Sequence, residues 1–372
     1  MKKAFIPFIL LLVSISGCGD QNSSLDSTPL SSEETSITSE STDYQNPVWE
    51  PVLADPSIIR ADDGTFYVYG TQDNAEWGDY FGTRYIPILS STNLVEWEAA
   101  GAVFKAATAP TWGTLGAGLW APDIVKIGDT YTLYYSLSTW GDDNPGIGVA
   151  TAPEPLGPWT DHGKLLDSTS SNVANSIDPT VYVDNGRVFM MWGSFCGIYA
   201  IELSADGLTI KDNADPKTRV LIAGVDGGPW NASSYEGAYV RKINEYYYLF
   251  LSTGTCCAGF SSTYRVMVAR ADNILGPYVD HTGVVMTNRL SGGKNVVDAN
   301  ERFVGVGHNA LITDDAGDYW MLYHGYDLQE NPQYGTTNRR ALLIDKLLWD
   351  ENDWPYVQDY GASTNNTRPV II

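Results

Sequence analysis

Four residues of this chain are of types that move protons, and each stands at a similar place in a repeated pattern. Asp55 and Asp178 precede proline, Glu236 precedes glycine, and His308 opens the sequence HNALIT. An Asp before Pro often caps a turn, so either aspartate taken alone has an ordinary structural explanation. Carboxyl groups that face one another across a cavity, one protonated and one ionised, would suit acid–base cleavage of a glycosidic bond.

The elements that must position these residues are five related stretches of sequence. Each has an apolar segment, a polar turn and a second, mostly apolar segment rich in aromatics, as in DPSIIRADDGTFYVYGT from Asp55 and APDIVKIGDTYTLYYSLST from Ala121. The other three begin at Asp178, Glu236 and His308. An irregular but persistent period of this kind is typical of a repeat whose unit holds several short strands. We therefore predict an all-β fold, a five-bladed β-propeller.

Propeller geometry would bring the matching positions of the repeats together. The first strand of each blade lines the central channel, so we expect the five matching positions to meet near its axis. In this alignment they are Asp55, Ala121, Asp178, Glu236 and His308. Because the acids occupy the same position in different blades, a functional role is favoured over turn capping for them.

Composition agrees with a turn-rich β protein and restricts the possible partners. The 372 residues include 36 glycines and 12% aromatic residues, and helical periodicity is scarce. The net charge of −23 argues against a nucleic-acid partner, because that binding needs a basic face, and no Lys/Arg cluster is present. Neutral ligands remain compatible with this charge.

The N-terminus is typical of an exported lipoprotein. Lys2 and Lys3 precede an apolar run that is too short to span a bilayer. Residues 15–18 (ISGC) resemble the bacterial lipobox. They predict a lipoprotein signal peptide over residues 1–17 and a membrane anchor on an acylated Cys18. A plain secretory signal cut nearby is the alternative.

The segment after the lipobox differs in composition from the rest of the chain. Residues 18–44 are mostly Ser, Thr, Asp and Glu, and cannot bury enough apolar surface to offset the entropy of ordering. We predict a disordered tether there and the propeller domain over residues 45–372.

Three cysteines remain beyond Cys18. Cys196, Cys256 and Cys257 are odd in number and define no disulfide framework. Small buried hydrophobes are the favoured interpretation of the adjacent pair, and a vicinal disulfide is the alternative in an exported protein. No spacing resembles a zinc site.

Eight motifs carry a family resemblance. LADPSIIR, LWAPDIV, NSIDPTVY, SYEGAYV and GHNALIT, in that order, resemble glycoside hydrolase family 43. STGTCCAGFSSTYRVMVAR, YHGYD and RRALLIDKLLWDENDWP are closer still to its endo-α-1,5-L-arabinanases. The resemblance covers about residues 47–360. It implies an inverting hydrolase of α-1,5-L-arabinofuranosidic bonds, expected to cut within arabinan chains.

The resemblance also implies roles for the residues at the channel. Asp55 would be the general base that activates water, and Glu236 the general acid. Asp178 would orient Glu236 and raise its pKa through a negative charge. His308 matches a histidine that reaches a channel ion, usually calcium, through waters. Because one imidazole is a poor ligand set for a hard cation, a histidine with no metal remains an open alternative.

Sugar binding requires aromatic faces and hydrogen-bonding groups. The expected platforms are Trp120 and Trp140, and the expected polar partners are Asn175, Ser176 and Ser194.

Other polar residues near these motifs receive structural interpretations. Asp123, two residues after Ala121, is expected to bond backbone or order a neighbour. His162 and His281 are expected in loops or packing. His324 matches the family pattern, but no role follows for it from the residues.

Residues 74–85 (NAEWGDYFGTRY) add length compared with the family pattern. At the mouth of the channel such a loop would favour cleavage near chain ends.

Three further expectations concern specificity, assembly and location. The rivals to an arabinanase are an arabinofuranosidase or β-xylosidase of the same family, and a non-catalytic glycan-binding lipoprotein. We expect a monomer whose partners are arabinan or arabino-oligosaccharides and the membrane that holds its lipid anchor. The expected location is the bacterial cell envelope, on the outer surface or the periplasmic face.

Overall fold

The computed structural model describes residues 42–75, 82–226, 234–288, 292–329 and 339–372. The predicted signal peptide, Cys18 and all but the end of the predicted tether lie outside these residues. Nearly all regular structure in the described chain is β. No helix within the described ranges has the length and apolarity needed to cross a bilayer.

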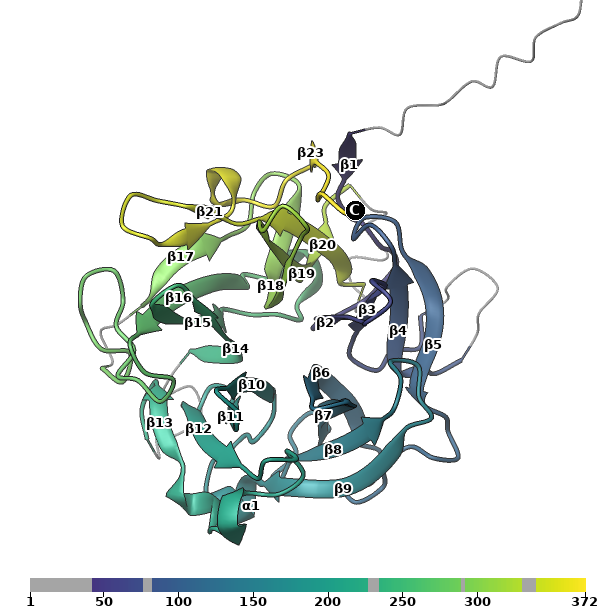
Figure 1. The fold of residues 1–372 in the computed structure, drawn as a ribbon, viewed down its shortest axis with the longest axis vertical. Helices are drawn as coiled ribbons and strands as arrows, with labels where there is room; N and C mark the ends of the chain where they lie inside the picture. Colours follow the sequence, from purple (N-terminus) through teal and green to yellow (C-terminus); the bar gives the residue numbers. More distant parts are fainter. Residues whose placement is uncertain (1–41, 76–81, 227–233, 289–291, 330–338) are drawn as a thin grey trace, which may run out of the picture. The chain divides into compact units, whose positions relative to one another are not determined.

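Five antiparallel sheets stand around a common centre as the blades of a propeller, and Figure 1 shows the first strand of each blade innermost. This confirms the predicted fold. Blade 1 contains β2 (Ser57–Arg60), β3 (Phe66–Tyr69), β4 (Tyr85–Ser91) and β5 (Glu98–Phe104). Blade 2 contains β6 (Gly118–Ile127), β7 (Thr130–Ser138), β8 (Gly146–Ala152) and β9 (Thr160–Asp167).

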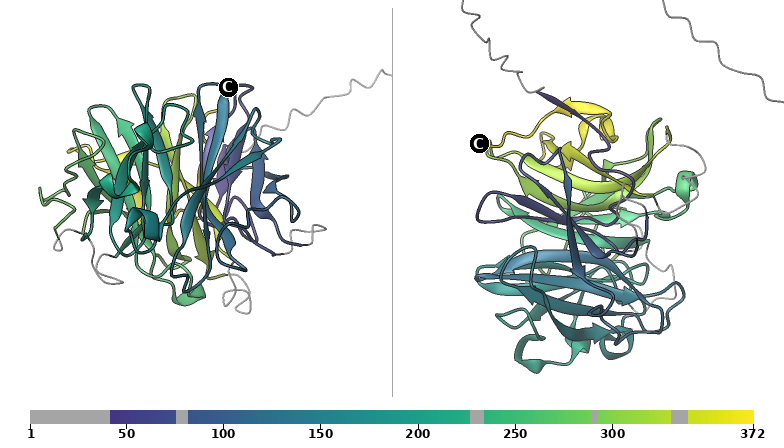
Figure 2. Two further views of the ribbon diagram at one scale, coloured as in Figure 1. Left: turned by 90° about the horizontal axis from the view of Figure 1, so that it is seen from below. Right: turned by 90° about the vertical axis from the view of Figure 1, so that its right-hand side faces the viewer.

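The remaining blades follow in chain order. Blade 3 contains β10 (Thr180–Asp184), β11 (Arg187–Trp192), β12 (Ile198–Leu203) and β13 (Val220–Ala223). Blade 4 contains β14 (Tyr235–Ile243), β15 (Tyr246–Thr253), β16 (Arg265–Ala271) and β17 (Lys294–Val297). Blade 5 contains β18 (Phe303–Thr313), β19 (Tyr319–Asp327) and β20 (Ala341–Lys346). Figure 2 shows the same blades from two sides.

Short elements complete the described chain. They are the helix α1 (Ser168–Ser171), the 3₁₀ turns Lys211–Asn213, Pro216–Thr218, Gly259–Ser261 and Gln358–Tyr360, and the strands β1 (Asp43–Gln45), β21 (Leu348–Trp349), β22 (Pro355–Tyr356) and β23 (Asn365–Thr367).

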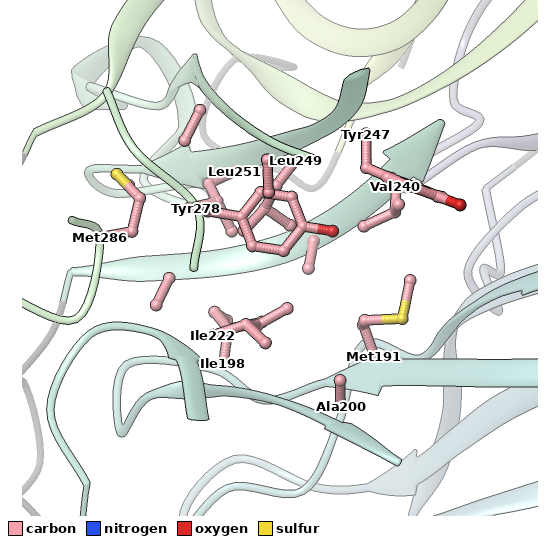
Figure 3. Close-up of a cluster of buried hydrophobic side chains, with 14 of the residues drawn as sticks. Met191, Ile198, Ala200, Ile222, Val240, Tyr247, Leu249, Leu251, Tyr278 and Met286 are labelled. Carbon is pink, nitrogen blue, oxygen red and sulfur yellow. The ribbon is translucent and has the colours of Figure 1, made fainter. Parts of the chain in front are cut away.

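The second strands are almost continuously apolar because each is covered on both faces by neighbouring blades. In β15, the six residues from Tyr247 to Ser252 are all buried, whereas an outer strand such as β16 mixes buried and exposed positions. Leu249 and Leu251 of β15 pack with Met191 and Ile198 of blade 3 (Figure 3). The core is therefore a series of apolar layers between sheets.

The ring closes where the N-terminal segment runs along blade 5. Val48 and Trp49 exchange backbone hydrogen bonds with Leu342 of β20, and β1 pairs with β23. Tyr44 is buried, and its hydroxyl donates to Ile344 O at 2.7 Å. The prediction of a disordered tether as far as residue 44 is therefore wrong at its end, because one aromatic side chain anchors that end.

Asp123 ties three blades together. Its Oδ1 accepts a hydrogen bond from Ser57 Oγ of blade 1 at 2.8 Å, and its Oδ2 accepts from Val181 N of blade 3 at 2.6 Å. Burial raises the pKa of Asp123 to about 7, against the lowering effect of these two donors. The predicted structural role is confirmed.

Candidate active site

An unusual backbone conformation marks the inner end of each blade. At one residue per blade φ is positive, between 41° and 57°, a region that non-glycine residues seldom occupy. These axial residues are Asp55, Ala121, Asp178, Gly237 and His308. In blades 2, 4 and 5 the strand pairing is also irregular at this residue, and a bulge of this kind re-aims side chains.

Polar side chains on or just after the second strand of the preceding blade accept the axial backbone N–H at four of the five junctions. The N–H of Ala121 donates to Thr71 Oγ1 at 2.8 Å, and that of Asp178 to Ser136 Oγ at 2.9 Å. In the same way the N–H of His308 donates to Ser252 Oγ at 2.8 Å. At the closing junction the N–H of Asp55 donates to His324 Nδ1 at 3.0 Å. His324 thereby acquires a role that its sequence context does not indicate.

Blade 4 departs from this pattern, which corrects the predicted alignment of Glu236. Glu236 pairs with Ser252 as Trp120 pairs with Ser136, so the axial residue of blade 4 is Gly237. Glu236 therefore stands one residue before the position that Asp55 and Asp178 occupy. A Cβ on Gly237 would lie 3.0 Å from His308 Nδ1 at a φ of +54°, and this crowding and backbone conformation favour glycine.

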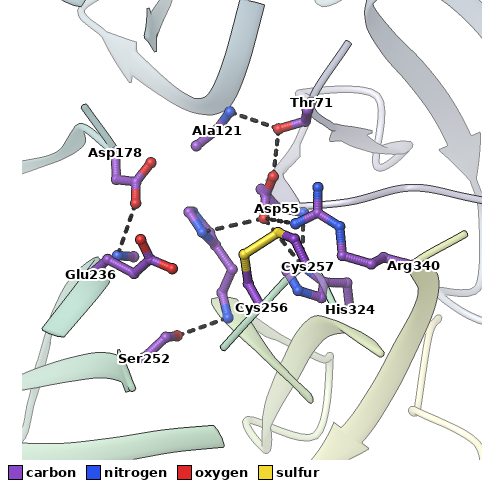
Figure 4. A network of polar contacts seen from close by, with 12 residues as sticks. Asp55, Thr71, Ala121, Asp178, Glu236, Ser252, Cys256, Cys257, His324 and Arg340 are labelled. Atoms are coloured by element: carbon purple, nitrogen blue, oxygen red, sulfur yellow. Dashed lines mark hydrogen bonds and ion pairs between the residues drawn. A yellow bond between two sulfur atoms is a disulfide. The ribbon is translucent and has the colours of Figure 1, made fainter. Parts of the chain in front are cut away.

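A cleft of about 670 Å³ opens over the channel and brings the predicted residues together. Asp55, Asp178, Glu236 and His308 all line it, and Figure 4 shows the three acids around its floor. Residues from all five blades contribute. The expected convergence of distant carboxyl groups is confirmed, with the one-residue shift at Glu236.

Asp55 is ionised. Its Oδ1 accepts from Arg340 Nη1 at 2.8 Å and its Oδ2 from Thr71 Oγ1 at 2.5 Å, and His308 Nδ1 lies 3.4 Å from Oδ1. Burial opposes the charge, but the neighbouring groups, the Arg340 guanidinium foremost, hold the pKa of Asp55 well below its ordinary value. This carboxylate is prepared to accept a proton rather than to donate one.

Burial disfavours the charged form of both histidines beside Asp55. Burial lowers the pKa of His308, and burial together with the Arg340 charge lowers the pKa of His324 to about 4. Because His324 Nδ1 accepts the Asp55 N–H, its hydrogen is on Nε2. The rings of His308 and His324 lie 6.4 Å apart.

Glu236 and Asp178 form a buried pair of carboxyl groups. Glu236 Oε2 accepts from Ser194 Oγ at 2.7 Å, and the Tyr264 hydroxyl also donates to Glu236. Asp178 Oδ2 accepts from Gly237 N at 3.2 Å. Burial raises both pKa values, and repulsion from Glu236 raises that of Asp178 further. Two such acids retain a proton to higher pH than isolated ones, as a proton donor requires.

Arg340 and Tyr264 are the main site residues absent from the predicted set. Arg340 immediately precedes β20, and Tyr264 immediately precedes β16; both line the cleft. Both lie in motifs of the family resemblance, RRALLIDKLLWDENDWP and STGTCCAGFSSTYRVMVAR, but no role was expected for either residue. The sequence signals that could have indicated them are the adjacent arginines before β20 and the tyrosine before β16. Neither signal shows which way the side chain points.

The predicted sugar contacts are placed in the cleft with one exception. Trp120, Trp140 and Asn175 line it, and the two indole rings lie 5.7 Å apart. Ser194 lines it as well, but its hydroxyl proton is donated to Glu236. The prediction of Ser176 as a sugar partner is wrong. Its side chain is fully buried and forms hydrogen bonds with nearby residues of the same chain, including Val173 O.

Cys256 and Cys257 are joined by a disulfide and line the cleft. The favoured prediction of two small buried hydrophobes is therefore wrong, and the vicinal disulfide is the structure that forms. Cys196 is a buried free thiol.

The predicted extra loop lies partly outside the described residues, which omit 76–81. Its ends are joined, because Asp73 and Arg84 pair through their backbones and form a buried ion pair. Gln72, just before the loop, lines the cleft.

The fold and this arrangement of acids define the class of protein. A buried carboxylate whose pKa is lowered, together with a pair of buried acids whose pKa values are raised, in an aromatic cleft of a propeller, is suited to acid–base hydrolysis of a glycoside. Residues 44–355 match the glycosyl hydrolases family 43. The chain belongs to that family.

Relatives and solved structures agree with this assignment. An extracellular exo-α-(1→5)-L-arabinofuranosidase of Cellvibrio japonicus is 33% identical over an alignment of 324 residues that covers 82% of this chain and 86% of the relative. An extracellular endo-α-(1→5)-L-arabinanase 1 of Bacillus subtilis is 30% identical over 82% of this chain and 87% of its own. The Cellvibrio cellulosa α-L-arabinanase complexed with arabinohexaose has a TM-score of 0.70 at 30% identity, covering 84% of this chain and 99% of its own.

Proposed function

We propose that this protein hydrolyses α-1,5-L-arabinofuranosidic bonds in arabinan with inversion of configuration. The observation that carries the proposal is the pairing of an ionised Asp55 with the buried acids Glu236 and Asp178 in one cleft. The names of the relatives support the substrate, since those reported above act on α-1,5-linked arabinan or are arabinanases.

In the proposed reaction Asp55 and Glu236 work on opposite sides of the scissile bond. Asp55 takes a proton from a water molecule as that water attacks the anomeric carbon, and Glu236 donates its proton to the departing oxygen. An inverting pair stands about 6.5–9.5 Å apart so that the water fits between base and sugar. Repulsion between Asp178 and Glu236 keeps a proton on this acid pair to higher pH, so that Glu236 can donate it, and Arg340 keeps Asp55 ionised.

Trp120 and Trp140 are the proposed sugar platforms. Trp140 is 79% exposed at the rim of the cleft, while Trp120 is partly buried. An exposed indole would offer a face to a sugar unit away from the acids, so we propose that the enzyme cuts within arabinan chains. Cleavage at chain ends, as in the Cellvibrio japonicus relative, is the second candidate. The sizes of the first products from linear arabinan distinguish the two.

We also propose a water-mediated calcium ion beside His308. Within the described ranges no three His, Cys, Asp or Glu side chains are placed to hold a metal together. The Asp55 oxygens already have partners, but burial favours the neutral form of His308, which lines the cleft, and this suits one imidazole ligand completed by water. Removal of calcium with EGTA should lower the melting temperature, and CaCl₂ should restore it. An unchanged melting temperature would remove calcium from the proposal.

Export and lipid attachment through Cys18 belong to the same proposal. The two curated relatives above are described as extracellular, which supports a protein that acts outside the cytoplasm. Labelling with a radioactive fatty acid tests the anchor: wild-type protein should be labelled and Cys18→Ala should not.

The catalytic proposal is tested by turnover of linear arabinan. Asp55→Ala and Glu236→Ala should each lower kcat/KM by about 10³-fold, a typical cost of removing a general acid or base. Glu98→Gln, on an exposed position of β5, is the matched control and should keep full activity. Retained activity in either alanine variant would remove that residue from the mechanism.

A further inference from the structure

The Cys256–Cys257 disulfide is the cleft feature that the proposed reaction does not use. It lies in the loop between β15 and β16 of blade 4, with Cys256 partly exposed and Cys257 exposed. In the view of Figure 4 the disulfide is seen between Glu236 and Arg340. The tryptophans that line the same cleft come from blade 2, across the channel from blade 4 in Figure 1.

The loop that carries the disulfide is fastened at both ends. Thr263 N donates to Thr255 O at 3.0 Å, and Thr255 N donates to Thr263 Oγ1 at 3.1 Å. Ser262 Oγ accepts from Ala258 N at 3.0 Å and donates to Cys256 O at 3.3 Å. Gly254 has a φ of +95°, and a Cβ there would lie 2.3 Å from Thr263 O. The two cysteines are therefore presented from a compact, well-bonded turn.

A disulfide changes the chemistry of this wall of the cleft. Two thiols would offer S–H donors and two independent side chains, whereas the disulfide has no donor and joins two sulfurs and two methylenes into one polarisable apolar surface. The same cleft is lined by the charged or polar groups of Asp55, Glu236 and Arg340. An apolar patch among polar groups suits a sugar ring, which has hydroxyls on its edge and C–H groups on its face.

We propose that the Cys256–Cys257 disulfide is a substrate-binding wall that contacts the C–H face of an arabinofuranosyl unit held over the acids. The inference rests on the proposed function and adds a binding element opposite Trp120 and Trp140. The disulfide contacts the substrate and takes no part in proton transfer. Its loss therefore weakens binding of the substrate and leaves the protonation of Glu236 unchanged.

Two paired variants test the wall. In Cys256→Ala/Cys257→Ala the bond is lost but the surface stays apolar, whereas Cys256→Ser/Cys257→Ser makes the same wall polar. We expect KM for linear arabinan to rise about threefold in the alanine pair and at least tenfold in the serine pair, with kcat within about threefold of wild type. The alkaline limb of the pH–rate profile should not move. Melting temperatures show whether both variants remain folded.

Reduction of the Cys256–Cys257 disulfide in the wild-type protein is an independent test that needs no substitution. Tris(2-carboxyethyl)phosphine cleaves the S–S bond to two thiols and is itself converted to the phosphine oxide, with water supplying the oxygen and the protons. The treatment should raise KM in wild type and change nothing in the alanine pair, which controls for effects elsewhere.

Binding without turnover separates this inference from the proposed function. In a Glu236→Gln background, calorimetric titration with arabinohexaose should give a Kd at least tenfold weaker when the serine pair is added. If wild type cleaves arabinan but KM and Kd stay within twofold in the serine pair, this inference is overturned and the proposed function stands. If wild type neither cleaves arabinan nor, as the Gln variant, binds arabinohexaose, both are overturned.

Discussion

Ser194 Oγ donates a hydrogen bond to Glu236 Oε2 at 2.7 Å. Glu236 lies one residue before the axial position of blade 4, and Ser194 lies one residue after the position that holds the axial acceptor in other blades. By strand pairing, Gly193 occupies the place of the axial acceptors Thr71, Ser136 and Ser252, and it has no side chain. The axial N–H of blade 4, that of Gly237, donates to Asp178 Oδ2 instead. The one-residue shift between blades 3 and 4 thus brings Glu236 and Asp178 together as a pair.

Ser194→Ala should raise the pKa of Glu236, because the Ser194 hydroxyl stabilises the carboxylate form. A higher pKa keeps the acid protonated to higher pH, so the alkaline limb of kcat should move upward. We expect kcat at neutral pH to fall less than about tenfold, the equivalent of one ordinary hydrogen bond. pH–rate profiles on linear arabinan check this, and an alkaline limb that moves downward would contradict it.

Asp178→Asn should have the opposite effect on the same limb. The repulsion between Asp178 and Glu236 is mutual, so removing one charge lowers the pKa of the remaining acid. Glu236 then loses its proton at lower pH, and the alkaline limb moves downward. Asparagine keeps an oxygen for the Gly237 N–H. A limb that stays in place in this variant would exclude Asp178 as a tuning residue.

Tyr264→Phe separates hydrogen bonding from packing at the acid. The tyrosine ring stacks on His324 at 5.7 Å with an angle of 8° between the planes, and phenylalanine preserves that contact. Loss of the hydroxyl removes a donor to Glu236, so its pKa should rise and the alkaline limb should move upward with little change in melting temperature. Tyr264→Ala, which removes the ring as well, should also lower the melting temperature. Equal melting temperatures in the two variants would refute the packing role.

Arg340→Met should affect the acid limb instead. The guanidinium is the largest of the influences that keep Asp55 ionised, so its removal raises the pKa of Asp55. The base is then protonated at higher pH, and the acid limb moves upward. Loss of one partner of a buried ion pair also costs about 3–5 kcal/mol of stability. Arg340→Lys should recover part of both effects, and the acid limb of kcat/KM together with urea denaturation measures them.

Asn46→Ala tests the closure of the ring. The Asn46 amide donates to Ile344 O at 2.9 Å, its oxygen accepts from Ile344 N at 3.0 Å, and the side chain is buried. Alanine would leave both backbone groups of Ile344 without this partner, so the free energy of unfolding should fall by about 2–4 kcal/mol. Asn365→Ala, at an exposed position of β23, is the control. Similar stability in the two variants would show that Asn46 is not needed for closure.

The repeat explains why so much of the site was predictable. In a repeat, motifs such as DPSIIR and DPTVY share one structural environment, so aligning them places Asp55 and Asp178 together without any knowledge of tertiary contacts. The limit of this reasoning is one residue: Glu236 and Gly237 fit the motif equally well, and only strand pairing shows that Gly237 is axial. Ser176 failed because it lies in the segment before β10, where its side chain is buried and its hydroxyl donates to Val173 O.

The sequence by itself determined the propeller, its five repeats and the three acids, because period and motif order are properties of the chain alone. Tertiary structure decided the charge states and the partners. Arg340 lies 285 residues from the aspartate that it keeps ionised, and Ser194 lies 42 residues from the glutamate to which it donates. Such pairs meet only when blades close into a ring, because burial, which makes these charges influence one another strongly, exists only in the folded molecule.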